Sequence, residues 1–273
     1  MKYFWIVLLC LLWPGMHISG QTYMQMADSV DRFTKERNWQ ASEKWLLKAL
    51  KKEPANPNNY LLLSNLGTVH RNMGRLSDAL ADYDNALSIT PNAVTILHNR
   101  AALLMEMDST RRAYADYGRI MELDKKDVAS RYFHGMIALG YGQLDIARGD
   151  FEGALTIDKK SVDAKRGMAA LNKIEGKAQE AVQLYTDVIK EENRLSNYLS
   201  RAECYMDLGR LPEAEADLQE AQKLNPSDSN IYLLKARLST LLYRYDDAVA
   251  YAKQARSLGA DADAVEEFMK KRP

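Results

Sequence analysis

Small residues recur along this sequence at intervals of 34 residues, with a single interval of 33, and this periodicity constrains the fold more than any other feature. One series of glycines and alanines consists of Gly67, Ala101, Gly135, Ala169, Ala202 and Ala236. A second series, made only of alanines, consists of Ala79, Ala113, Ala147, Ala181, Ala214 and Ala248. Self-similarity at a fixed period of about 20–50 residues is typical of arrays in which each unit packs on its neighbours. The sequence therefore predicts a solenoid of repeated units.

Each repeated unit has the pattern of two antiparallel helices. Large apolar residues between the small ones follow the i, i+3, i+4 spacing of amphipathic helices, and no useful length of sequence alternates as a strand would. Turn-forming residues separate the two helices, as at 74–78 and 209–213. Ser77 and Asp78 are expected to cap the helix that follows the first of these turns, and Pro212 suits the first turn of a helix.

Residues 60–93 carry a more specific pattern, which consists of Leu66, Gly67, Gly74, Ala79, Tyr83, Ala86 and Pro91. This segment resembles the tetratricopeptide repeat, which has about 34 residues, at nearly every signature position. The pattern continues in units that we place at 23–56, 60–93, 94–127, 128–161, 162–194, 195–228 and 229–260. Residues 261–271, with Val265 and Phe268 on the apolar side, are expected to form a capping helix. The resemblance implies an all-α fold, a right-handed α-solenoid of about seven tetratricopeptide helix-turn-helix repeats plus a C-terminal capping helix, within a single domain of residues 21–273.

The first 20 residues have the layout of a secretory signal peptide. Lys2 precedes an unbroken apolar run of residues 4–13, residues 14–15 (Pro-Gly) break this run, and small polar residues follow at Ser19 and Gly20. We expect cleavage between Gly20 and Gln21. The run is short for a membrane-spanning helix, which needs about 20 apolar residues, and an uncleaved anchor is the alternative. The sequence therefore predicts an exported protein, periplasmic in the first place and otherwise surface-bound or secreted, and it resembles repeat proteins of the bacterial envelope.

Composition and charge exclude several kinds of function. Lys plus Arg and Asp plus Glu number 37 each, and no basic patch typical of a nucleic-acid binder stands out. The lysine pairs at 51–52, 125–126 and 159–160 lie where helices are expected to end, and there the helix dipole favours cations. Cys204 is expected to be a small buried hydrophobe, and His70 and His134 are expected to be buried with hydrogen-bonding partners.

No catalytic signature accompanies these residues. The sequence has no His-Glu-x-x-His motif, no phosphate-binding loop and no dinucleotide fingerprint, and its histidines lack the spacing of a zinc site. The glycines on either side of Tyr141 are expected to end a helix. We therefore expect a protein that is no enzyme and that uses neither a metal nor a small-molecule cofactor.

A stack of helix pairs has a concave inner surface, which is the usual binding face of repeat proteins. The resemblance places first-helix residues in this groove, and the candidate peptide-binding residues are Asn65, His98, Asn99, Met105, Tyr132, Phe133, Met136, Arg166 and Lys173. We expect the two aromatic residues to anchor an apolar peptide segment. The two asparagines would hydrogen-bond the peptide backbone, and the two cations would meet an acidic flank.

An alternative is that Tyr132 and Phe133 turn aside and pack between repeats, because aromatic residues at helical spacing usually belong to the core. Some proteins of the resembled family clamp a C-terminal carboxylate with Lys and Arg at groove positions. In this chain Ala129 and Phe133 occupy the positions that such a clamp would need. Binding of chaperone tails in that manner is therefore not expected.

These observations predict a non-catalytic scaffold that binds a protein or peptide partner in the concave groove of a repeat superhelix, in an exported compartment. The alternative is a structural subunit of a cell-envelope assembly, or a self-associating oligomer, with an unused groove. In both cases no nucleic acid is involved, and a membrane is met only through an envelope complex. The fold does not decide between them, because repeat scaffolds serve unrelated functions.

Overall fold

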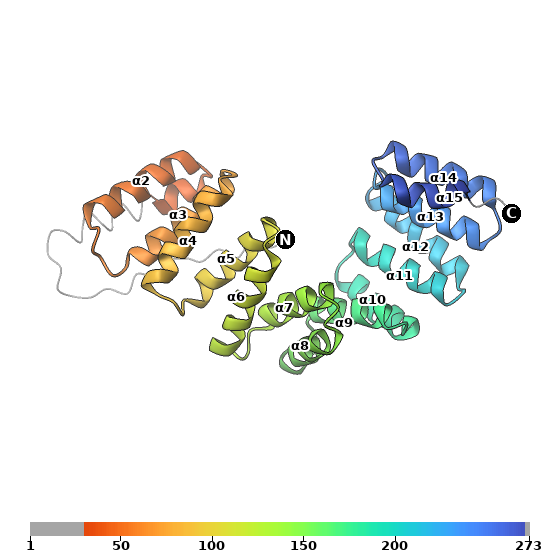
Figure 1. Ribbon diagram of the computed structural model, residues 1–273, viewed down its shortest axis with the longest axis horizontal. Coiled ribbons are helices and arrows are strands. Elements are labelled where there is room, and N and C mark those ends of the chain that lie inside the picture. Colours follow the sequence, from red (N-terminus) through yellow and green to blue (C-terminus); the bar gives the residue numbers. More distant parts are fainter. Residues whose placement is uncertain (1–29, 271–273) are drawn as a thin grey trace. The chain divides into compact units, whose positions relative to one another are not determined.

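The computed structural model describes residues 30–270, and none of these residues lies in a β-strand (Figure 1). Helical residues 30–35 come first. The helices that follow are α2 (Trp39–Lys52), α3 (Asn59–Asn72), α4 (Leu76–Ile89), α5 (Val94–Glu106), α6 (Thr110–Leu123), α7 (Val128–Gly140), α8 (Leu144–Ile157), α9 (Val162–Ile174), α10 (Ala178–Glu191), α11 (Leu195–Asp207), α12 (Leu211–Leu224), α13 (Ser229–Leu241), α14 (Tyr245–Ser257) and α15 (Ala262–Lys270). The predicted all-α fold is confirmed. The predicted signal peptide, residues 1–20, lies outside the described residues.

The helices pack in adjacent pairs joined by short turns. The most extensive contacts join α3 with α4, α7 with α8, α9 with α10, α11 with α12, and α13 with α14. Second helices also contact the first helix of the next pair, as α4 does with α5, α8 with α9, α10 with α11, and α12 with α13. A pair thus buries its apolar sides against its neighbours in sequence, which is the architecture of a solenoid.

The chain divides into two compact units, residues 1–116 and residues 117–273, and the division falls within α6. Unit 1 contains α2 to α5, and unit 2 contains α7 to α15. Each unit is a stack of helix pairs in its own right. The single domain of residues 21–273 that the sequence led us to expect stays a prediction.

The periodic small residues lie where aromatic rings pass between helices. In unit 1 a Cβ atom added to Gly67 would lie 2.8 Å from Cε1 of Tyr83. In unit 2 a Cβ atom would lie 2.7 Å from Cε1 of Phe151 if added to Gly135, and 2.4 Å from that atom if added to Gly167. Both rings are buried, and packing at these distances leaves no room for a side chain. The predicted close approach of the paired helices is confirmed at Gly67 and Gly135.

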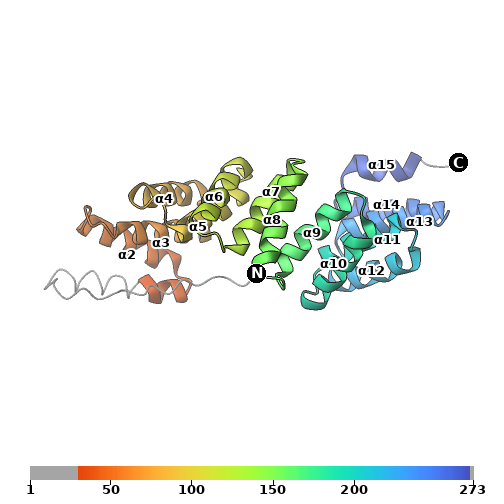
Figure 2. The same ribbon diagram turned by 90° about the horizontal axis from the view of Figure 1, so that it is seen from below.

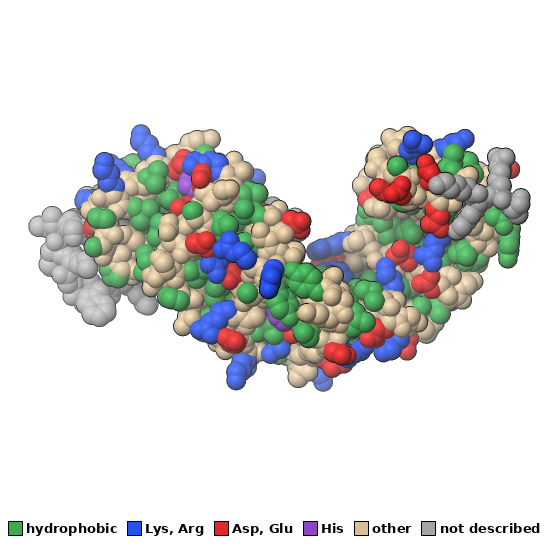
Figure 3. All heavy atoms as spheres, viewed as in Figure 1, with side chains coloured by type: hydrophobic (Ala, Val, Ile, Leu, Met, Phe, Trp, Pro, Cys, Tyr) green, Lys and Arg blue, Asp and Glu red, His purple; other side chains and the backbone are tan. Residues whose placement is uncertain are grey.

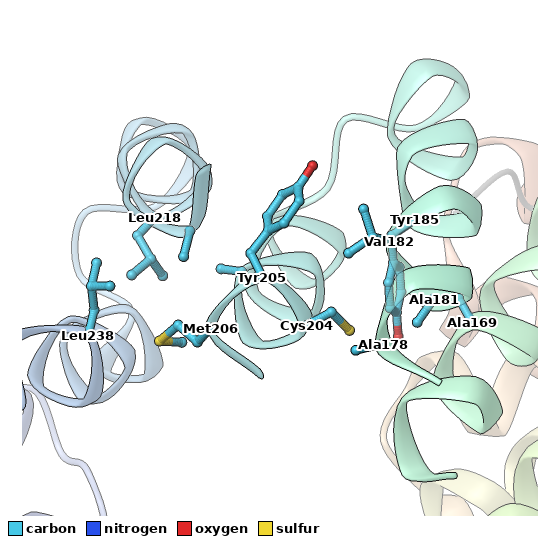
Figure 4. Packing of buried hydrophobic residues seen from close by; sticks show 12 residues of the cluster. Ala169, Ala178, Ala181, Val182, Tyr185, Cys204, Tyr205, Met206, Leu218 and Leu238 are labelled. Carbon is cyan, nitrogen blue, oxygen red and sulfur yellow. The ribbon is translucent and has the colours of Figure 1, made fainter. Parts of the chain in front are cut away.

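A buried cluster in unit 2 shows how one helix serves two interfaces (Figure 4). Cys204 of α11 faces α10, where Tyr185 lies, whereas Met206 of the same helix faces Leu238 of α13. The buried members of the cluster are Ala169, Ala178, Ala181, Val182, Tyr185, Ala202, Cys204, Tyr205, Met206, Ala214, Leu218 and Leu238. The stability of each helix pair therefore depends on the pairs on both sides.

Most turns within a pair contain a glycine with positive φ, namely Gly74, Gly142, Gly176 and Gly209. After the first of these glycines a single residue, Arg75, precedes the start of α4 at Leu76. The prediction that Ser77 and Asp78 cap this helix was wrong, because the glycine turn lets the helix begin before them. Asp78 lies instead in the first turn, where its carboxylate accepts a hydrogen bond from Nε of Arg75 at 2.7 Å. Pro212 lies in the first turn of α12, as predicted.

The last helix, α15, covers the end of unit 2, where it lies against α13 and α14 (Figures 1 and 2). Val265 is 1% exposed, and Phe268 packs against the same buried cluster. Asp263, Glu266 and Glu267 remain exposed. The predicted division of this helix into an apolar and a polar side is confirmed, and the polar side ends the stack as a cap requires.

Candidate functional site

Within unit 2, the first helices of successive pairs contact one another: α7 meets α9, α9 meets α11, and α11 meets α13. The second helices mainly contact the first helices on either side of them. The layer whose helices approach each other is the inner side of a curved stack, and this is where a binding face was predicted. We call the surface formed by α7, α9, α11 and α13 the inner layer of unit 2.

An aromatic group lies on α7, where hydrophobic side chains gather at the surface (Figure 3). The ring of Phe133 stacks on the ring of Tyr117 from α6, with centroids 5.1 Å apart. Tyr132 meets the edge of Phe133 at 5.1 Å and lies 6.4 Å from the buried ring of Phe151. Phe133 is 39% exposed, whereas Tyr132 is half-buried toward the core. Of the two predicted anchors, Phe133 offers an accessible ring, and the half-buried ring of Tyr132 packs against the ring of Phe133. Met136, one turn later, is half-buried.

The predicted cations of the inner layer are paired within the chain. Arg166 of α9 forms ion pairs with Asp163 and with Glu192, and Nζ of Lys173 lies 2.5 Å from Oε2 of Glu203 on α11. A further pair links α11 to α13, because Nη2 of Arg237 lies 2.7 Å from Oδ1 of Asp207. Most of these pairs join one helix of the stack to a neighbouring segment. An acidic segment of a partner would have to displace these carboxylates.

Exposed aliphatic residues accompany Phe133 on the inner layer. Ile174, the last residue of α9, is 55% exposed, and Leu241, the last residue of α13, is 41% exposed. Leu208, directly after α11, is 37% exposed. Neither Ile174 nor Leu241 was among the candidate residues, although the two occupy the same position at the end of their helices. Ile174 directly follows the candidate Lys173, and Leu241 lies two repeats beyond it. The inner layer of unit 2 thus combines apolar anchors with charges that neutralise each other.

The remaining candidate residues lie in unit 1. Asn65 on α3 and Asn99 on α5 occupy the same position in successive pairs, and both are half-buried. His98 is half-buried beside Asn99, and Met105 is 37% exposed. The two asparagines keep amide groups near the surface one repeat apart, as hydrogen bonding to a peptide backbone requires. Their predicted role stays a prediction.

His70, which is buried, and His134, which is half-buried, are hydrogen-bonded to carboxylates. Nδ1 of His70 lies 2.6 Å from Oδ2 of Asp82, and Nε2 lies 3.0 Å from Oε1 of Glu43. Nδ1 of His134 lies 2.5 Å from Oδ2 of Asp150. The predicted hydrogen-bonding partners are confirmed for both histidines, and the predicted burial is confirmed for His70.

Cys204 is fully buried, and burial raises the pKa of its thiol to about 11. The burial confirms the prediction that Cys204 is a small buried hydrophobe. A protonated thiol without access to solvent is also a poor nucleophile. Among residues 30–270, no group of three or more His, Cys, Asp or Glu residues is arranged to hold a metal ion. Within the same part of the chain, no helix has the length and apolar character that a membrane span needs.

A series of buried aspartates was not foreseen. The second helices carry them one residue before the large core residue, and the series consists of Asp82, Asp116, Asp150 and Asp217. Arg201 donates to both carboxylate oxygens of Asp217, at 2.8 Å from Nε and 2.7 Å from Nη2. Arg100 binds Asp116 in the same manner at 2.8 and 2.6 Å. The recurring Asp-aromatic dipeptide at 82–83, 116–117 and 150–151 was the available sequence signal. These pairs hold first and second helices together rather than forming a site.

Comparison with known proteins gives consistent results. Residues 60–93 and residues 174–238 each match a sequence profile of the tetratricopeptide repeat. The crystal structure of a tetratricopeptide repeat protein from Parabacteroides merdae superposes with a TM-score of 0.75 at 32% identity, covering 92% of this chain and 98% of that one. The predicted solenoid fold is therefore confirmed.

Curated relatives match at lower identity. DnaJ homolog subfamily C member 3 of Gallus gallus is 24% identical over 208 residues, which are 69% of this chain and 40% of that protein. Hsp70-Hsp90 organizing protein 3 of Arabidopsis thaliana is 26% identical over 213 residues, which are 63% of this chain and 38% of that protein. The chain thus spans well under half the length of these two relatives. The activities of the relatives as whole proteins are therefore not assigned to this chain.

Proposed function

Because the chain belongs to the tetratricopeptide-repeat family, we propose that it is a non-catalytic scaffold that binds a segment of a protein partner on the inner layer of unit 2. One observation carries this proposal. Phe133 presents an exposed aromatic ring, fixed by stacking on Tyr117, on a surface where Arg166 and Lys173 are already paired with carboxylates. Rigid aromatic residues in such positions are the usual anchors of protein interfaces.

The partner segment that fits this surface is apolar. Phe133, Ile174 and Leu241 offer exposed hydrophobic area on first helices of the stack. Lys173 and Arg237 are neutralised by Glu203 and Asp207, so the surface between the anchors attracts neither sign of charge strongly. Binding would therefore draw on burial of apolar area and depend weakly on salt.

Two relatives carry names that refer to chaperones, a DnaJ homolog and an Hsp70-Hsp90 organizing protein. An acidic chaperone tail is nevertheless a poor fit for this chain. Ala129 and Phe133 stand where a carboxylate clamp would need Lys and Arg, and Arg166 is bound to its own carboxylates. We propose an apolar segment in place of a charged terminus.

We also propose that the protein acts in an exported compartment, the bacterial periplasm in the first place. Support comes from the sequence of the first 20 residues, with Lys2, the apolar run of residues 4–13 and the small residues Ser19 and Gly20. Fractionation of cells that produce the full chain, with the mass of the mature protein measured, tests this directly. A soluble cytoplasmic protein that retains residues 1–20 would contradict it.

A peptide-display selection against residues 21–273 tests the binding function. The selected peptides are then titrated by fluorescence anisotropy against the wild type, Phe133→Ser and Ile146→Ser. Ile146 is the matched control because it is 43% exposed on α8, a second helix outside the inner layer. We expect Phe133→Ser to weaken binding by about 30-fold, as the loss of a hot-spot residue does. Ile146→Ser should leave the affinity unchanged.

Circular dichroism verifies that both variants are folded. Selection of apolar peptides that lose affinity with Phe133→Ser alone supports the proposal. Peptides that bind both variants as they bind the wild type contact another surface, and the inner layer is then not the binding site. If no peptide is selected and the chain instead increases in mass with concentration in light scattering, the role of a structural subunit is favoured.

A further inference from the structure

The outward face of α2 in unit 1 carries lysines around an exposed leucine. Its exposed residues are spaced at i, i+4, i+7, i+8 and i+11, and they are Gln40, Lys44, Leu47, Lys48 and Lys51. Residues at this spacing lie on one side of an α-helix. Leu47 is 48% exposed near the middle of the group. We call these five residues the α2 basic face, and Lys and Arg side chains project from the surface over α2 (Figure 3).

The carboxylate nearest to this face in the sequence points away from it. Glu43 accepts hydrogen bonds from Nε2 of His70 at 3.0 Å and from Nη1 of Arg75 at 2.6 Å, toward the interior of unit 1. Lys48 has a cation–π contact with the ring of Trp45 at 4.7 Å, which is compatible with its exposure to solvent. Within residues 30–270, no ion pair involves the three lysines of the face. Among the described residues, this positive charge is therefore not neutralised by an ion pair.

Positive charge is concentrated in this part of the chain. Residues 30–56 contain seven basic and four acidic residues, whereas residues 57–273 contain 29 basic and 32 acidic ones. The helix dipole accounts for Lys51 and Lys52 in the last turn of α2, in line with the expectation from the sequence. It does not account for Lys44 and Lys48, which precede the last turn and surround Leu47.

An occupant of this face has to match positive charge and an exposed aliphatic side chain at once. The surface of a bilayer with anionic lipids does so, because its phosphates attract lysines and its hydrocarbon boundary accepts apolar side chains. Lysine stems can lie along the apolar boundary while the ammonium groups reach the phosphates. We propose that the α2 basic face docks unit 1 directly on an anionic membrane surface. This goes beyond the protein-mediated membrane contact expected from the sequence.

The position of the face along the chain fits this role. The apolar run ends at Trp13, and residues 14–29 separate it from the first described residue, Val30. Sixteen extended residues reach at most about 55 Å. If the run is kept as an anchor, the first repeat is held within that distance of the bilayer. If it is cleaved, the face has to bind by its own charge, so the test uses the chain without the run.

Co-sedimentation with lipid vesicles tests the proposal. Residues 21–273, which retain every described residue, are mixed with phosphatidylcholine vesicles that contain or lack phosphatidylglycerol. We expect binding only with the anionic lipid, and weaker binding as salt is raised. The double variant Lys44→Glu/Lys48→Glu should bind at least about 30-fold more weakly. The matched control, Lys159→Glu/Lys160→Glu, makes the same change of charge at exposed residues of unit 2 and should bind as the wild type does.

Loss of binding in the α2 variant alone, with both variants folded by circular dichroism, supports the proposal. Equal loss in both variants would mean that net charge acts without a defined face, and this overturns it. Absence of wild-type binding to anionic vesicles at low salt also overturns it. If the protein binds a polyglutamate peptide through the same lysines and leaves the vesicles unbound, the face takes an acidic polypeptide and not a membrane. None of these results bears on peptide binding through Phe133, which is measured separately.

Discussion

Gly167 lies in the interior of α9 with the ring of Phe151 directly beside it. An added Cβ atom would lie 2.4 Å from Cε1, 2.6 Å from Cδ1 and 2.7 Å from Cζ of that ring. The ring has no space to retreat, because Phe151 is fully buried and Gly135 packs against the same Cε1 atom. Overpacking of a core costs about 1–3 kcal/mol, and overlap with three ring atoms places Gly167→Ala at about 3 kcal/mol.

Helix propensity acts in the opposite direction. Alanine in a helix interior is favoured over glycine by about 1 kcal/mol, so the expected net loss of stability for Gly167→Ala is about 2 kcal/mol. Gly149→Ala is the matched control, because Gly149 lies in the interior of α8 and an added Cβ atom meets nothing within 4 Å. This control should gain about 1 kcal/mol. The two substitutions, chemically identical, should therefore differ by about 3 kcal/mol.

Urea unfolding followed by far-ultraviolet circular dichroism measures the difference, with the slope of the transition compared to verify that the same unit unfolds. Addition of Phe151→Leu should remove most of the cost of Gly167→Ala, since residues in contact show non-additive effects. If Gly167→Ala is as stable as Gly149→Ala, the ring of Phe151 is free to move and the account of its close packing against Gly167 is refuted.

Two further predictions concern buried polar groups of unit 2. Asp217→Ala should lower the free energy of unfolding by about 3 kcal/mol, because it leaves the guanidinium of Arg201, which is 14% exposed, without its carboxylate. A loss below about 1 kcal/mol in urea unfolding would show that the pair contributes no more than a surface ion pair does. The Cys204 thiol, with its pKa raised to about 11, should stay unmodified by iodoacetamide in the folded chain at pH 9.0, the ordinary thiol pKa, and should react at once in urea. Fast modification of the folded chain at that pH would contradict the burial of the thiol.

The features that repeat could be predicted from the sequence. The spacing of Gly67 and Gly135 located the close contacts between paired helices, because helices that approach closely in every repeat need a small residue at the same place each time. The apolar spacing of Val265 and Phe268 identified the last helix and the side that it buries. Cys204 and His70 were predicted as buried from their places in the helical pattern.

Features that depend on a partner in another helix could not be predicted. Arg166 and Lys173 looked free in the sequence, but they pair with Glu192 and Glu203, which follow 26 and 30 residues later. Side-chain contacts at such separations follow from the angle between helices, which no local pattern specifies. The N-cap of α4 was predicted wrongly for a similar reason, because the positive φ of Gly74 determines where that helix begins. For the same reason the sequence did not separate the exposed ring of Phe133 from the inward-turned ring of Tyr132.

The capping helix α15 has a consequence for the dynamics of unit 2. It contacts α13 and α14, so its detachment uncovers a single pair, whereas α9 and α10 cannot separate from the stack without uncovering neighbours on both sides. The free energy of local opening should therefore be lowest at the C-terminal end and rise toward the middle of the unit. A partner held across α7 to α13 opposes every opening that disrupts its contacts. Binding would then register as slower hydrogen exchange in α9 and α11, whereas α15, whose detachment leaves the partner's contacts intact, would exchange as it does in the free protein.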